Sequence, residues 1–171
     1  MKKLSFFFLP FVYCLLLIAS GCKAKYSFTG ASVSPDIKTF SVKYFQNNAP
    51  VVNPSLSQTF SEKLKEKIIS QTSLSHTDKQ ADLTLEGDIS GYSTQPIAIQ
   101  SNETASLNRL TISIRVKFTN IKNEKQNFET SFSRFADYDS RQNLADVEQQ
   151  LSATITDQIV DDIFNKVFIN W

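Results

Sequence analysis

Regular alternation of apolar and polar residues predicts four β-strands along this chain. The strands fall within residues 37–45, 81–92, 110–118 and 128–132, and the third of them alternates most regularly. The last three follow one another closely, so they are expected to pair as a meander. Each leaves one face polar, which favours antiparallel neighbours over a parallel strand covered on both faces.

Two longer segments follow the helical period. The first begins after Asn53, a residue type favoured at N-caps, and Pro54, which suits the first helical position. Over about 18 residues its apolar side chains recur at every fourth position, as an amphipathic helix requires; they are Leu56, Phe60, Leu64 and Ile68. The second can be capped by Ser140 or Asn143, and its apolar stripe continues for about seven turns towards the end of the chain.

The order strand, helix, three strands, helix predicts an α+β fold. We expect a two-layer sandwich in which two long helices pack on one face of a mixed, mostly antiparallel sheet of about four strands. The place of the first strand in the sheet stays open. Gly87 and Gly91 lie on the apolar side of the second strand, where they would admit a helix closely or mark a bulge. The expected core is Phe60, Leu64, Ile68, Leu83, Leu85, Ile112, Ile114, Val116, Leu151, Ile155 and Ile159.

The start of the chain is typical of a bacterial lipoprotein signal. Lys2 and Lys3 precede an apolar run over residues 4–19, which is shorter than the ~20 residues of a membrane-spanning helix. Small residues at 19–21 then stand directly before Cys22, the residue that would carry the lipid. The alternative is an ordinary secretory signal peptide that happens to end near a cysteine.

This interpretation divides the chain into three parts. Residues 1–21 would be removed, residues 22–36 would form a lipidated tether, and residues 37–171 would form a single α+β domain of ordinary size for one core. The residues after Cys22 carry neither an acidic run, which would indicate display on the outer surface, nor a lone aspartate, which would indicate retention at the inner membrane. By elimination, we expect the anchor in the outer membrane with the domain facing the periplasm.

Composition narrows the possible functions. Removal of residues 1–21 takes away two of the 18 basic residues and none of the 17 acidic ones, which leaves a net charge of about −1 and no basic surplus for nucleic acid. Cys14 would leave with the signal and Cys22 would carry lipid, so no disulfide is expected. The sequence has one histidine and none of the common hydrolase, zinc or nucleotide motifs. We therefore expect no enzyme activity, cofactor or metal, and regard Glu86 and Asp88 as a solvated strand face rather than a catalytic pair.

The candidate contact residues lie within a long connection at 93–106 and on the strand that follows it. It is long for a hairpin and carries Pro96, Ile97 and Ile99, apolar residues that a purely solvent-facing turn would rarely contain. The neighbouring cations could meet phosphate groups on lipopolysaccharide; they are Arg109, Arg115 and Lys117. The competing interpretation is cross-strand pairing with acidic residues of the previous strand, namely Asp82, Glu86 and Asp88.

Taken together, five segments resemble the LPS-assembly lipoprotein (LptE) family in its Bacteroidetes-type form. They are Tyr26–Gly30, Asn53–Phe60, Glu86–Tyr92, Asn108–Ile112 and Asp162–Asn165. The resemblance implies a two-helix, four-strand sandwich inside the outer-membrane β-barrel LptD. There it would support assembly of the barrel and delivery of lipopolysaccharide to the outer leaflet.

Other classes of function remain beside this one. A stand-alone, periplasm-facing lipoprotein could bind an apolar ligand or another envelope protein, but no sequence feature indicates a cavity. A hydrolase would need a convergent catalytic site, and the sequence shows none.

Overall fold

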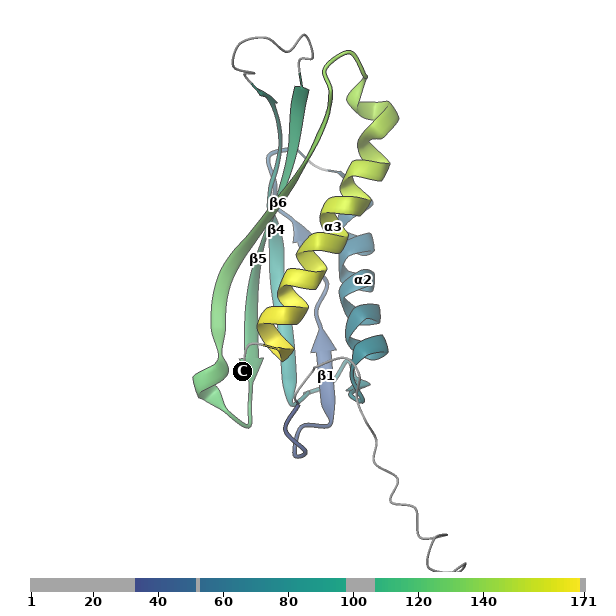
Figure 1. Cartoon of the computed structure of the whole chain (residues 1–171). Helices are drawn as coiled ribbons and strands as arrows, with labels where there is room; N and C mark the ends of the chain where they lie inside the picture. Colours follow the sequence, from purple (N-terminus) through teal and green to yellow (C-terminus); the bar gives the residue numbers. More distant parts are fainter. Residues whose placement is uncertain (1–32, 52, 98–106, 170–171) are drawn as a thin grey trace, which may run out of the picture.

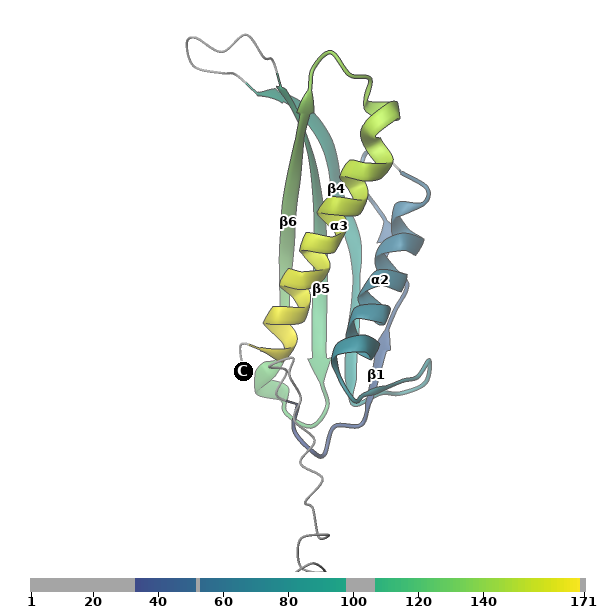
Figure 2. The same ribbon diagram turned by 45° about the vertical axis from the view of Figure 1, so that its right-hand side comes forward.

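The computed structural model describes residues 33–51, 53–97 and 107–169, which fold into two layers. Both helices lie on one face of a twisted sheet, as Figures 1 and 2 show. The elements in chain order are β1 (Thr39–Val42), β2 (Gln46–Asn47), α2 (Leu56–Gln71), β3 (Ser75–His76), β4 (Leu83–Ile97), β5 (Leu107–Asn120), the 3-10 turn η1 (Glu124–Gln126), β6 (Phe128–Asp139) and α3 (Leu144–Phe168). The predicted α+β sandwich, with its helices together on one side, is confirmed.

The sheet is mixed, and the described residues give it six strands instead of about four. Its order is β3-β1-β4-β5-β6, and β2 pairs with β4. The long pairs β4–β5 and β5–β6 are antiparallel, while β1, β2 and β3 make short parallel pairs. The two additional strands, β2 and β3, have two residues each, too few for an alternating pattern to reveal.

Asp82 fixes the first strand beside β4. Its Oδ2 accepts hydrogen bonds from the backbone N–H of Lys38 at 2.9 Å and from that of Thr39 at 3.0 Å. The Lys38 N–H is the largest cause of the lowered pKa of this carboxyl. The place of β1, left open by the sequence, is therefore between β3 and β4.

The core fills the space between the helices and the inner face of the sheet. Every predicted core residue is buried except Leu151, which is only partly buried at its margin. Phe40, Phe45 and Phe168 are also fully buried. The Phe45 ring meets that of Phe60 edge-to-face at 5.0 Å, so the segment after β1 packs directly on α2.

The helix starts differ in detail from the prediction. Helix α2 begins at Leu56 and its N-cap is Ser55. Asn53 is not the cap; its Oδ1 instead accepts from the Ser55 backbone N–H at 3.1 Å and the Ser55 hydroxyl at 2.9 Å, which turns the chain into the helix. Of the two candidate caps for α3, Asn143 is used, and its side chain accepts from the Ala145 N–H.

A β-bulge between Ile89 and Gly91 changes which face of β4 each residue occupies. Before it, Leu83, Leu85 and Ile89 face the core; after it, Tyr92 does so, and Gly91 pairs with Ser113 on the opposite face. Gly91 therefore marks the bulge. It does not lie on the apolar side of the strand, where the alternation had placed it.

Both helices run in the same direction. Their N-termini lie towards the end of the molecule where the β4–β5 pair extends beyond them, as Figure 1 shows. Lys63 pairs with Asp157, and Lys67 Nζ lies 2.7 Å from Asp161, which ties α2 to α3. Arg134 makes two hydrogen bonds to Asp162, at 2.6 and 2.7 Å, and ties β6 to the same helix.

Candidate functional site

Two of the candidate cations lie on the face of the sheet that the helices do not cover, called the open face below. Both are paired with carboxylates of the neighbouring strand. Lys117 stands opposite Glu86, with Nζ 2.8 Å from Oε1, and Arg115 stands opposite Asp88, with Nε 3.4 Å from Oδ1. This is the cross-strand arrangement that the sequence offered as the competing interpretation. Surface pairs of this kind contribute little to stability, so both cations can exchange partners at small cost.

Arg109 takes its partner from the other side. Gln95 is its neighbour on β4, whereas β6 places Asp137 opposite it. The guanidinium donates to both carboxylate oxygens, at 2.7 and 2.9 Å, and this pairing lowers the pKa of Asp137. The guanidinium carbon also lies 3.5 Å from the centre of the Phe135 ring, a stacked cation–π contact.

The apolar candidates do not all belong to a loop. Pro96 and Ile97 are the last two residues of β4, and Ile97 pairs with Leu107 across the end of the hairpin. The predicted 93–106 connection is therefore wrong at its start, because residues 93–97 continue the strand. Ile99 lies outside the described residues.

No grouping of metal ligands supports a catalytic centre among the residues that the structure describes. Within them, His, Cys, Asp and Glu side chains form no group of three or more that could hold a metal ion. Glu86 and Asp88 each face a cation across the β4–β5 pair. Over the same ranges, neither helix combines the length and apolar character that a membrane crossing requires.

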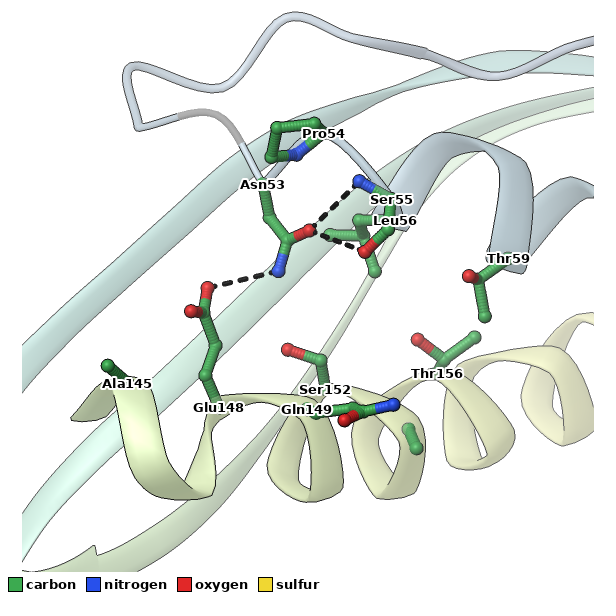
Figure 3. Close-up of a pocket in the computed structure, with 11 residues that line it drawn as sticks. Asn53, Pro54, Ser55, Leu56, Thr59, Ala145, Glu148, Gln149, Ser152 and Thr156 are labelled. Carbon is green, nitrogen blue, oxygen red and sulfur yellow. Dashed lines mark hydrogen bonds between the residues drawn. The ribbon is translucent and has the colours of Figure 1, made fainter. Parts of the chain in front are cut away.

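A polar cleft of about 570 Å³ separates the N-terminal halves of the two helices, and Figure 3 shows the residues that line it. Glu148 of α3 is its charged group. Its Oε1 accepts from the Asn53 side chain at 3.0 Å and from the Tyr92 hydroxyl at 2.5 Å. A strand, a loop and a helix are thus joined at one carboxylate oxygen.

Burial and the adjacent Glu148 carboxylate raise the pKa of Tyr92 to about 12 from its ordinary value of 10.0. Both causes disfavour the charged phenolate in the folded state. The unfolded chain therefore loses this proton near pH 10 and the folded protein only near pH 12, so the contribution to stability is complete below pH 10 and is lost between the two values.

Tyr92→Phe tests this linkage. The wild-type melting temperature should fall more steeply between pH 10 and 12 than that of Tyr92→Phe, because the variant has no phenol to titrate. Melting curves at half-unit pH steps, followed by circular dichroism, give the comparison. Parallel pH profiles for the two proteins would show that Tyr92 is not the responsible group.

Sequence reasoning missed the cleft because its parts are far apart in the chain. Asn53 and Glu148 are 95 positions apart. Asn53 carries a recognisable capping signal, but nothing in the local pattern of α3 distinguishes Glu148 from a solvated side chain. The bulge that turns Tyr92 inward is likewise a consequence of pairing with β5.

Known proteins were compared with this chain by sequence and by structure. Comparison with curated proteins finds no significant match. Among solved structures, the chain is similar to a minor lipoprotein from Acinetobacter baumannii, with a TM-score of 0.51 and 11% identity over 77% of this chain and 92% of that one. It is also similar to lipoprotein B from Nitrosomonas europaea, with a TM-score of 0.47 and 15% identity over 77% of this chain and 83% of that one.

The first of these likenesses shows a shared fold. Family membership rests on the sequence. A family model described as LptE, lipopolysaccharide-assembly, matches residues 37–167 and so covers most of the chain, including every described strand, all of α2 and all but the last residue of α3. This protein belongs to the lipopolysaccharide-assembly (LptE) family.

Proposed function

We propose that the protein is an outer-membrane lipoprotein that supports assembly of the lipopolysaccharide-export barrel LptD and delivery of lipopolysaccharide to the outer leaflet. The observation that carries the proposal is the family match over residues 37–167. This role requires surfaces that bind a barrel and a lipid, and it does not require the chain to catalyse a reaction. The cations of the open face, Arg109, Arg115 and Lys117, are the candidate contacts for lipopolysaccharide phosphates.

The proposal includes a lipid anchor on Cys22, after removal of residues 1–21 and with residues 22–36 as the tether. The first 32 residues lie outside the described part, so the sequence signal carries this step. The fold is compatible with it. The described chain enters the domain beside β1, at the end opposite the β4–β5 tip (Figure 1), so a tether on this side leaves the tip free.

Cys22→Ala should leave the domain folded and release it from the membrane fraction. The reason is that stable anchoring takes more than one acyl chain, all of which depend on this cysteine. Fractionation, intact mass and a melting curve of both proteins test the prediction. Recovery of wild-type protein with residues 1–21 still attached would contradict it.

Depletion of the protein should reduce the amount of correctly assembled barrel and leave lipopolysaccharide short of the cell surface. Both follow if the chain is a subunit that the barrel needs for assembly. Heat-modifiable migration of the barrel and surface labelling of lipopolysaccharide measure the two effects. If depletion leaves both unchanged, the assignment fails.

Complementation of the depleted strain then tests the candidate contacts. Substitutions within residues 94–104 should impair barrel assembly without lowering the melting temperature.

The double variant Arg115→Gln, Lys117→Gln should weaken lipopolysaccharide binding, because both cations lie on the open face. Lys79→Gln is the matched control, since Lys79 is exposed but belongs to the turn after β3. Equal lipopolysaccharide binding by the double variant and the control would remove Arg115 and Lys117 from the candidates.

A further inference from the structure

The two outer edges of the sheet differ in a way that bears on partner binding. On one side the sheet ends in β3, which has two residues, and beyond Ile89 in the last part of β4, which carries the bulge and Pro96. The other is β6, which has twelve residues, pairs with β5 along its length and has no partner on its far side among the described residues. Figure 2 shows β6 along the outer side of the sheet. A long free edge presents a row of unpaired backbone N–H and C=O groups, to which another strand can add.

Edge strands are usually protected by proline, lysine, a bulge or shortness. Strand β6 contains neither proline nor lysine. Its pairing with β5 from Phe128 to Asp139 is continuous, without the register shift that β4 has. The same sheet therefore has one blunted edge and one regular edge of full length.

Three of the four charged residues of β6 do not protect it either, because each is paired with an opposite charge within the chain. Arg134 is bound to Asp162 of α3, and Asp137 is bound to Arg109 of β5. Asp139 pairs with Arg141, which lowers the pKa of that carboxyl to about 2. Glu129 stands directly opposite Lys117, whose ammonium group is bound to Glu86. Beyond Glu129, an incoming strand would thus meet little uncompensated charge.

The stretch Thr130–Ser133 at the middle of this edge is uncharged. Thr130, Ser131 and Ser133 are exposed, and Phe132 is partly buried against the core. Because side chains alternate across a strand, Phe132 lies on the helix side and the two serines on the open side. Phe135, on the open side, is 49% exposed.

We propose that β6 is a docking edge for strand addition, and that its occupant is an uncharged extended segment of the partner barrel. The alternation along the edge favours apolar residues beside Phe132 and small polar residues beside Ser131 and Ser133. A closed barrel wall has no free edge of its own, so the segment must come from outside the wall. Main-chain hydrogen bonds would supply the affinity, as in other cases of β-augmentation. The inference rests on the proposed function, since the barrel supplies the segment.

Hydrogen exchange of the full-length product, purified in neutral detergent alone and then with its barrel, tests the proposal. Alone, the outward-facing amides of β6 should exchange quickly. In the complex their exchange should slow by about tenfold or more, because strand addition places them in hydrogen bonds. Docking through side chains alone would leave these amides exchanging at the free rate. Protection in the purified protein alone would mean that a second copy or another part of the chain occupies the edge. Either result overturns the proposal.

Edge variants separate this proposal from the proposed function itself. Thr130→Lys combined with Ser131→Lys places uncompensated charge on both faces of the edge at exposed positions. Ile69→Lys combined with Ser70→Lys adds the same charge at two exposed positions of α2, which lies on the helix layer and is distant from β6 in sequence. With melting temperatures matched, the edge variant should lose most of its co-purified barrel, and the control should keep it. If the edge variant retains the barrel as the control does while depletion still impairs assembly, strand addition is wrong and the proposed function stands.

Discussion

Gly87→Ala should lower the free energy of unfolding by about 3 kcal/mol or more, at the upper end of what overpacking costs. A methyl group at this position would overlap the backbone carbonyl oxygen of Arg115 on β5 and would lie 2.8 Å from Cε1 of Phe45. The carbonyl belongs to the strand paired with Gly87, and the Phe45 ring is fully buried against Phe60. Neither neighbour can retreat without separating β4 from β5 or displacing α2.

Gly91→Ala provides the matched control on the same strand. Its methyl group would meet Cβ of Ser113 at 3.2 Å and Oγ at 3.4 Å, and a serine on the open face can adjust. The expected cost is below about 1 kcal/mol. Urea denaturation of both variants measures the difference. Equal destabilisation would show that the close approach at Gly87 is relieved more easily than its packing indicates.

The contrast between the two glycines also shows where sequence reasoning stopped. Alternation placed both on the apolar side, because it counts positions in steps of two. The bulge between Ile89 and Gly91 inserts one residue, so every later residue of β4 changes face. Nothing in the local sequence marks that position, since a bulge is a property of the pair of strands and its partner β5 lies more than twenty residues away.

The end of β4 was missed for a related reason. Residues 93–95 are polar and are followed by Pro96, a composition that is typical of a loop rather than of a strand. Pairing with residues 107–111 nevertheless holds them in the strand. Beyond Ile89 no described strand pairs with the other side of β4, so Pro96 has a free edge on which its missing N–H costs no ladder bond.

The helices and the long strands were predictable because each buries one continuous stripe or face. The cross-strand pairs of Lys117 and Arg115 were predictable too, since an opposite charge on the neighbouring strand is the simplest partner. Arg109 shows the limit of that reasoning. A central strand has two neighbours, and only the register with β6 assigns Asp137 to it.

Ile114→Ala should destabilise the domain by about 2–5 kcal/mol, the range found when large aliphatic core residues are truncated. Ile114 is fully buried on β5, the central strand of the three long ones. It lies between Ile89 of β4 and Phe132 of β6, and the helix layer covers its face of the sheet. Neighbours held on both sides by strand pairing cannot close the cavity, so the cost should include lost packing as well as lost burial.

Ser113→Ala is the natural comparison, because it changes the adjacent residue on the opposite face of the same strand. Ser113 loses one exposed hydrogen bond, from its Oγ to that of Ser133 at 3.0 Å, and the expected cost is under about 1 kcal/mol. Urea denaturation with a shared m-value gives both figures. If the two substitutions destabilise the protein equally, the helix layer does not bury the face of β5 that carries Ile114, and the two-layer arrangement of the core is wrong.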